Sequence, residues 1–125
     1  MLDPAMPRPT HSAGELGVTF ERPDVLHAVL VVEGEIDTLT AGALEDALTQ
    51  LLADPCEVLV LDFSAVTFLA SSGLAVLIRS AREAGERRLR LVSSARAVRR
   101  PMEITGSDRL FDMYADRAAA LSPSN

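Results

Sequence analysis

Residues 61–74 read LDFSAVTFLASSGL, an apolar run that leads into a short polar turn with two adjacent serines. Beyond the turn, apolar residues recur at the i, i+3, i+4, i+7 spacing of one helix face, at Leu74, Leu77, Ile78 and Ala81. The pattern predicts a buried strand over residues 57–63 and an amphipathic helix over residues 72–84. Two hydroxyl groups, those of Ser71 and Ser72, are therefore expected where a helix begins.

A serine at the start of a helix has two interpretations. As the N-cap, Ser71 would accept a hydrogen bond from a first-turn amide that has no partner inside the helix. The same amides, together with the helix dipole, also favour a phosphate group at this position. Capping alone explains a serine here, so position by itself does not separate a structural residue from a regulatory one.

Strands and helices alternate along the rest of the chain. Strands are predicted over residues 16–21, 27–36, 57–63, 88–93 and 113–114, and helices over residues 38–52, 72–84, 95–105, 108–111 and 116–121. Such alternation is typical of an α/β fold with parallel strands. Thr40 is the candidate cap of the first helix, Gly106 follows the end of another, and Pro101 either kinks that helix or starts a second one. One core is predicted to contain Leu44, Leu48, Leu51, Val60, Leu74, Leu77 and Ile78.

The order of three motifs resembles the STAS family, the domain of bacterial anti-sigma factor antagonists and of sulfate transporter tails. The motifs are VVEGEID at residues 31–37, the Ser71-Ser72-Gly73 turn, and the segment over residues 97–111. The resemblance covers residues 16–120. It implies an α/β fold with a single STAS-like domain over residues 15–121, in which α-helices pack on a small mixed β-sheet. A flexible tail is expected at residues 1–14 and a C-terminal tail at residues 122–125.

Length and composition agree with one small domain. The chain has 125 residues, of which 48% are hydrophobic, and this is enough for one core. No apolar run approaches the roughly 20 residues that cross a membrane, and the proline-broken residues 1–9 do not resemble a signal peptide. Cys56 is the one cysteine, which fits a reducing compartment and a structural role. We therefore expect a cytoplasmic protein without membrane insertion.

The charged residues of the chain exclude several reaction mechanisms and ligands. The net charge is −6 and all 12 basic residues are arginines, so mechanisms that depend on lysine, such as a P-loop or a Schiff base, are excluded. An acidic chain also argues against direct nucleic acid binding. A local basic stretch is either a solvated face or a docking patch for an acidic partner, and it comprises Arg87, Arg88, Arg90, Arg96, Arg99 and Arg100.

The sequence lacks residues that common enzyme sites require. Ser71 has no Gly-x-Ser-x-Gly elbow, and His11 and His27 are poorly placed to act as its base. Asp62 ends a strand as the phospho-acceptor of a receiver domain does, but that chemistry needs a lysine. The sequence clusters no metal ligands and has no phosphate-cradling glycine loop. We expect no catalytic residue, no metal and no cofactor.

The STAS resemblance implies an anti-sigma factor antagonist that binds a GHKL-type anti-sigma factor kinase, frees the sigma factor, and is disabled by serine phosphorylation. The acceptor maps onto Ser71, with Ser72 as second choice and Asp37, Ala70 and Gly73 as neighbours. A phosphatase would reverse the modification. The family usually has an aspartate before the acceptor, and this chain has Ala70 instead. Partner contacts are expected at Leu69, Leu74, Val76, Arg79 and Arg82.

Two alternatives to this function stay open at the level of sequence. In the first, the domain is an accessory subunit of an ABC-type membrane transport system and binds its ATPase through the same helix. In the second, it is a sensor that binds a small anion at the Ser71 helix end. The identity of a co-purified protein would separate the antagonist from the transport subunit, and the sensor would bind a phosphate-bearing ligand without a protein partner.

Overall fold

Five strands form a mixed sheet in the order β1-β2-β3-β4-β5. The computed structural model describes residues 15–122. The sheet begins with β1 (Gly17–Glu21), which is antiparallel to β2 (His27–Ile36). The remaining strands run parallel to β2, and they are β3 (Val58–Leu69), β4 (Leu89–Val92) and β5 (Asp112–Tyr114). The predicted mixed sheet is therefore confirmed. The tail predicted at residues 1–14 lies outside the described residues, as do residues 123–125 of the tail predicted at 122–125.

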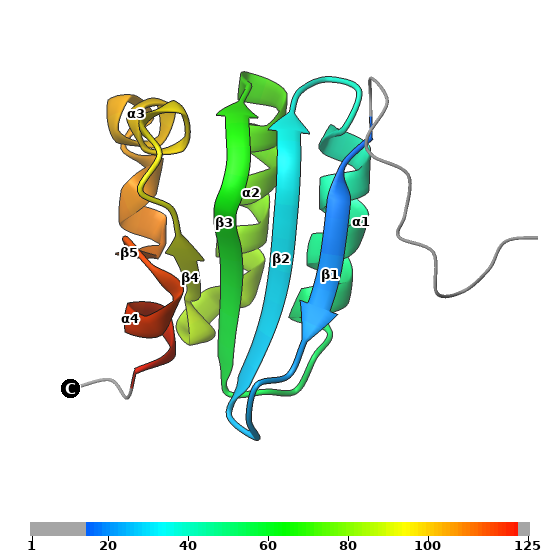
Figure 1. Ribbon diagram of the computed structural model, residues 1–125, viewed down its shortest axis with the longest axis vertical. Helices are drawn as coiled ribbons and strands as arrows, with labels where there is room; N and C mark the ends of the chain where they lie inside the picture. Colours follow the sequence, from blue (N-terminus) through cyan, green and yellow to red (C-terminus); the bar gives the residue numbers. More distant parts are fainter. Residues whose placement is uncertain (1–14, 123–125) are drawn as a thin grey trace, which may run out of the picture.

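Helices cover both faces of this sheet unequally. Two of them, α1 (Ala41–Leu52) and α2 (Ser71–Ala84), lie behind the strands in Figure 1, and α3 (Arg96–Thr105) packs beside the upper part of β3. The short α4 (Arg117–Leu121) packs on the opposite face. Two 3-10 turns complete the fold, η1 (Gly85–Arg87) and η2 (Ser107–Leu110). None of the helices over residues 15–122 is long and apolar enough to span a bilayer.

The main core lies between the sheet and helices α1 to α3. Alternate residues of β3, namely Leu59, Leu61 and Phe63, are fully buried in it together with the inward faces of the helices. Of the predicted core residues, Leu44, Leu48, Leu51, Leu74 and Leu77 belong to this cluster, and Ile78 packs against it half-buried. The prediction that Val60 lies in this core is wrong. The alternation of side chains along β3 points it to the opposite face.

A smaller core lies on that opposite face, beneath α4. Val60 is buried there with Val29, Val92 and Ala120. Two arginines hold the helix in place: Arg90 donates to the Ala120 carbonyl over 2.6 Å, and Arg117 pairs with Glu21 and, at 3.6 Å, with Asp62. Asp62 is buried and also accepts from the Ser64 hydroxyl at 2.6 Å, so its carboxylate has a structural role.

The end of β3 differs most from the sequence prediction. The strand expected to end at Phe63 continues to Leu69, because the chain stays paired with β2 across two register shifts, although Val66 is the one buried residue within 64–68. Helix α3 passes through Pro101 without a second helix beginning there. Gly106 ends α3 with a left-handed φ of 77°, which confirms the predicted glycine stop.

Leu77 tests the assignment of the α2 face to the core. Its side chain is fully buried between α2 and the sheet, so Leu77→Ala should lower the free energy of unfolding by about 2–5 kcal/mol. Leu39→Ala is the matched control, since Leu39 is 72% exposed and its truncation should cost under about 0.5 kcal/mol. Thermal and urea unfolding measure both; equal melting temperatures for Leu77→Ala and the parent would refute the packing.

Candidate functional site

The ends of β2 and β3 bring the predicted switch residues together. Ile36 and Leu69 are paired at the last position of these parallel strands, and the Ala70 amide donates to the Ile36 carbonyl over 2.8 Å. Asp37 follows Ile36, and Ser71 follows Ala70 as the first residue of α2. The site therefore lies at the carboxyl end of the sheet, which is the upper end in Figure 1.

Ser71 is not the N-cap of α2, contrary to the sequence prediction. The cap is Ala70, which has extended backbone angles (φ −85°, ψ 169°), and no side chain at the cap bonds the helix amides. The helix begins one residue earlier than the serine pattern indicates. As a result Ser71 is exposed, and the cap leaves the first-turn amides of α2 without a side-chain acceptor.

Ser72 lies in a different environment from Ser71. Its hydroxyl oxygen is buried and has no hydrogen-bond partner among the residues that the structure describes. A modifying enzyme reaches only an accessible hydroxyl, so the geometry favours Ser71 over Ser72 as an acceptor.

Gly73 allows α2 to approach the end of β2 closely. A Cβ atom at this position would lie 2.2 Å from Ile36 Cγ2 and 3.1 Å from Leu69 Cδ1. Because Cβ atoms do not tolerate contacts under 3.0 Å, any larger residue would push the helix away from the sheet. The glycine thus has a packing role at the switch site.

Asp37 shapes the turn that precedes α1. Its carboxylate accepts from the Leu39 amide at 2.9 Å and from the Thr40 amide at 3.1 Å. Thr40 occupies the cap position of α1, but its hydroxyl does not cap the helix; it donates to the Glu35 carbonyl over 2.8 Å and accepts from the Asp37 amide. Asp37 therefore fixes the loop beside Ser71.

The three apolar residues predicted to touch a partner are buried. Leu69, Leu74 and Val76 belong to the main core, since each faces the sheet or the neighbouring helices. They are not available as surface contacts, and this part of the prediction needs correction. Four of the five exposed residues of α2 instead form a stripe at successive turns, which we call the α2 stripe: Ser71, Ala75, Arg79 and Arg82.

Two exposed apolar residues at the carboxyl end of the sheet were missed from the sequence. Leu39, in the loop after β2, is 72% exposed, and Phe68, at the end of β3, is 48% exposed. Large apolar side chains that remain exposed at one end of a sheet are typical of contact surfaces. The signal in the sequence was a Phe beside a polar turn, but a strand predicted to end at Phe63 left its position undefined.

Most of the basic stretch serves the fold. Arg88 pairs with Asp112 at 3.0 Å, Arg90 is buried over the Tyr114 ring, and Arg99 donates to the Ser93 carbonyl. Arg96 and Arg100 stay exposed on α3. The stretch is therefore neither one solvated face nor one docking patch.

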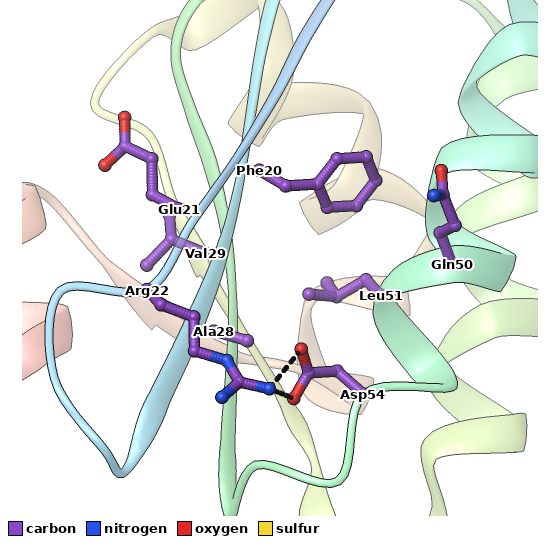
Figure 2. A pocket seen from close by; sticks show the side chains of 8 residues that line it. All are labelled: Phe20, Glu21, Arg22, Ala28, Val29, Gln50, Leu51 and Asp54. Carbon is purple, nitrogen blue, oxygen red and sulfur yellow. Dashed lines mark hydrogen bonds and ion pairs between the residues drawn. The ribbon is translucent and has the colours of Figure 1, made fainter.

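A hollow of about 240 Å³ lies between β1 and α1, away from Ser71. Figure 2 shows Phe20 and Gln50 on its two sides, Leu51 and Ala28 at its base, and the Arg22–Asp54 pair closing one end. Glu21 also lines it but points away from the other side chains. The hollow contains an ion pair and apolar groups, without a nucleophile beside a base, and residues 15–122 hold no cluster of three metal ligands.

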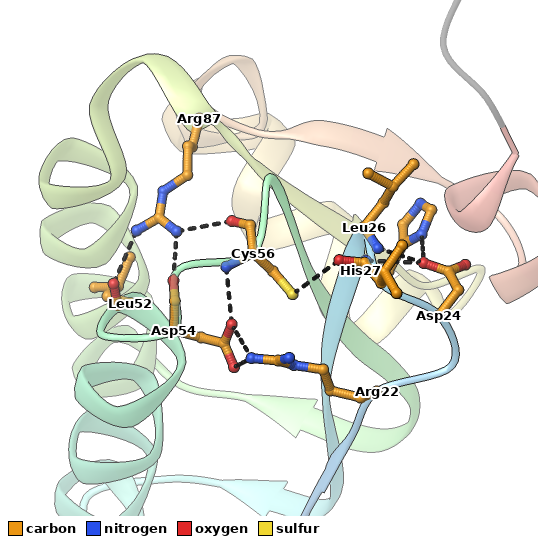
Figure 3. Close-up of polar contacts among 9 residues, drawn as sticks. Arg22, Asp24, Leu26, His27, Leu52, Asp54, Cys56 and Arg87 are labelled. Atoms are coloured by element: carbon orange, nitrogen blue, oxygen red, sulfur yellow. Dashed lines mark hydrogen bonds and ion pairs between the residues drawn. The ribbon is translucent and has the colours of Figure 1, made fainter.

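A network of polar contacts closes the end of α1 opposite the switch (Figure 3). Arg87 donates to the carbonyls of Leu52, Asp54 and Cys56 at 2.8, 2.6 and 3.0 Å. These bonds satisfy carbonyl groups at and just beyond the C-terminus of the helix. The Asp54 carboxylate accepts two bonds from Arg22 Nη2, at 2.7 and 2.8 Å, and one from the Cys56 amide.

Hydrogen bonds and burial shift the pKa values of Asp54, Cys56 and Asp24. The hydrogen bond from Arg22 lowers the pKa of Asp54, and the bond from the Cys56 amide lowers it further. Burial raises the pKa of the Cys56 thiol, which makes it a poor nucleophile and agrees with the structural role expected for it. His27 is buried with its Nδ1 2.7 Å from Asp24, a contact that lowers the pKa of Asp24 and leaves His27 outside the switch site.

Gly73 and Gly42 form a matched pair of helical glycines. Gly73→Ala should destabilise the fold by about 1–3 kcal/mol, because its new methyl group meets Ile36. Gly42→Ala in α1 should stabilise it by about 0.5–1 kcal/mol, because nothing lies within 4 Å of the new methyl group. Urea unfolding measures both changes, and a stabilising Gly73→Ala would contradict the close approach of α2 to β2.

Asp54 gives a pH dependence of defined sign. Because its pKa is lowered in the folded state, its contribution to stability is present above the unfolded pKa of about 4 and is lost as the pH falls through the folded value. Asp54→Asn should therefore melt below the parent at pH 7, and the difference should shrink toward pH 2–3. Asp46→Asn, which alters an exposed acid on α1, is the control; a difference for Asp54→Asn that grows on acidification would contradict the network.

Comparison with known proteins places this geometry in a family. Residues 19–120 match the STAS domain. The anti-sigma-F factor antagonist RsfB of Mycobacterium tuberculosis is 38% identical over 96 residues, which cover 76% of this chain and 79% of that protein. An anti-sigma factor antagonist from Mycobacterium paratuberculosis superposes with a TM-score of 0.81 at 37% identity, covering 88% of this chain and 94% of that one.

A more distant structure shares the fold. The Bacillus cell fate determinant SpoIIAA in its phosphorylated form superposes with a TM-score of 0.61 at 16% identity, over 82% of this chain and 96% of that one. The match over residues 19–120, the identity to RsfB and the five-stranded mixed sheet agree with one another, and the chain belongs to the STAS domain family.

Proposed function

We propose that this protein is an anti-sigma factor antagonist that binds a kinase-type anti-sigma factor at the start of α2 and is switched off by phosphorylation of Ser71. The observation that carries the proposal is the contrast between two adjacent serines. Ser71 is exposed as the first residue of α2, whereas the Ser72 hydroxyl is buried. The identity to RsfB, an anti-sigma-F factor antagonist, supports the same role.

A binding surface of mixed character surrounds Ser71. Leu39 and Phe68 supply exposed apolar area at the same end of the sheet, and the α2 stripe runs from Ser71 through Ala75 to Arg79. Arg79 pairs with Glu45 of α1 at 3.1 Å, and both side chains are more than half exposed. A combination of exposed apolar side chains and arginine is typical of protein interfaces.

Phosphorylation at this position changes the interface without changing the fold. A phosphate adds about −1.5 to −2 charges at neutral pH. The first-turn amides of α2 have no side-chain acceptor at the cap, and a helix N-terminus stabilises an anion, so the folded state accommodates the group. The cost falls on the complex, where the charge must be desolvated beside Leu39 and Phe68.

Ala70 makes this helix start more open than the usual family pattern. An aspartate at the cap position would place its own carboxylate on the first-turn amides. Alanine has no such group, so the amides stay accessible to a phosphate on Ser71. The kinase would bind a site that lacks the carboxylate of this aspartate. We expect phosphorylation to be slower for this reason.

The proposed role is that of a binding partner and kinase substrate, not of an enzyme. His27, the one histidine of residues 15–122, is buried and bonded to Asp24, so it does not serve Ser71 as a base. A GHKL-type kinase would modify Ser71 and a phosphatase would restore it. A pulldown with mass spectrometry identifies the partner: recovery of an ABC-type ATPase would favour the transport subunit, and binding of a small phosphate-bearing ligand without a protein partner would favour the sensor.

Charge at Ser71 is predicted to control binding. Ser71→Asp should weaken binding to the anti-sigma factor identified in the pulldown by more than about a hundredfold, which corresponds to roughly 3 kcal/mol, while keeping the parent melting temperature. Ser71→Ala should bind like the parent and resist phosphorylation. Isothermal titration calorimetry measures the affinities, and a differential scan measures the melting temperatures.

Two control variants sharpen this experiment. Gln50→Glu adds a negative charge on the exposed side of α1 beside the hollow of Figure 2, and its affinity should match that of the parent. Ala70→Asp should raise the melting temperature by capping α2 and should speed phosphorylation. Phosphate mapped to Ser72, or full binding by Ser71→Asp, would overturn the proposed switch.

A further inference from the structure

The exposed side of α3 carries a basic stripe that the proposed switch does not use. Arg96, Arg100 and Ile104 are spaced four residues apart, so they lie one above another on the same helix face. Both arginines are exposed, and Ile104 is 68% exposed. The opposite face of α3 buries Val98 and Met102 in the main core. We call Arg96, Arg100 and Ile104 the α3 stripe.

The arginines of this stripe differ from most others in the chain. Seven arginines within residues 15–122 bond to acids or carbonyl groups of the fold, namely Arg22, Arg79, Arg87, Arg88, Arg90, Arg99 and Arg117. Over the same residues, the structure records no hydrogen bond or ion pair for the side chains of Arg82, Arg96, Arg100 and Arg109. The charges of Arg96 and Arg100 are therefore free for an external group.

The position of these charges is unfavourable for the helix itself. Arg96 is the first residue of α3, and the first turn contains no acid. A positive charge at a helix N-terminus opposes the helix dipole, so the arrangement lowers the stability of α3. A departure from the favourable charge pattern is expected where function, and not folding, determines the residue.

We propose that the α3 stripe is a second contact for the anti-sigma factor. It binds an acidic surface of that protein that has an apolar residue at its edge. The inference rests on the proposed function. Charge complementarity supports it: this chain has a net charge of −6, so an acidic partner is attracted only where positive charge is concentrated and unpaired. Ile104 supplies the apolar contact at the end of the stripe.

The location of α3 allows one partner to reach both stripes. Helix α3 packs against β3 and contacts α2, and in Figure 1 it lies at the end of the sheet where α2 begins. A stable protein interface buries about 800 Å² on each partner. The few exposed residues around Ser71 are too small a surface for this, so a partner seated on α2 extends onto neighbouring elements.

Reversal of charge at Arg96 tests the α3 stripe. Arg96→Glu should keep or raise the melting temperature, because an acid at the first helical position is favoured by the dipole. Its association rate with the anti-sigma factor identified above should fall about tenfold at low salt, and the dependence of that rate on salt should become weaker. Arg100→Glu should act in the same direction. Stopped-flow kinetics at two salt concentrations and a melting curve provide these readings.

Arg109→Glu is the matched control, because Arg109 is an exposed arginine outside the stripe with the same change of charge. Its association rate should stay within about twofold of the parent. If the parent binds and Arg96→Glu associates as fast as Arg109→Glu, the α3 stripe is wrong and the proposed function stands. If the parent binds no anti-sigma factor at all, both proposals fail together.

Discussion

The close approach of α2 to the end of β2 determines where this protein presents its serine. Gly73 allows the contact, because a side chain at this position would overlap Ile36. The paired ends of β2 and β3 then fix Asp37 and Ala70 at one edge of the sheet. The helix begins one residue earlier than its serine pattern suggests, so Ser71 faces solvent while the Ser72 hydroxyl is buried.

The residues that hold α2 on the sheet differ from those that α2 exposes to solvent. Leu74 and Leu77 hold α2 on the sheet from its inner face, and the hydrogen bonds from Arg87 close the far end of α1. The outer face of α2 and the exposed Leu39 and Phe68 take no part in the core. In the proposed function, the helix amides would accommodate a charge added at the start of α2, and its energetic cost would appear only when a partner covers it.

Much of the fold was predictable from sequence, because apolar periodicity marks α1, α2 and the buried strands directly. The face of Val60 was not, since a strand with a continuous apolar run can bury either set of alternate residues. The length of β3 was missed because its last residues are half exposed and paired through a bulge. Burial of Leu69, Leu74 and Val76 depends on the helix orientation, which neighbouring elements set and local sequence does not.

The affinity of the anti-sigma factor for the Ser71-phosphorylated protein tests the central claim most directly. The phosphorylated and unphosphorylated forms are compared in one titration series, with the modified residue confirmed by mass spectrometry and both melting temperatures recorded. The account predicts an affinity at least about a hundred times weaker for the phosphorylated form, with an unchanged melting temperature. Equal affinities of the two forms, or a loss of binding that follows unfolding, would contradict it.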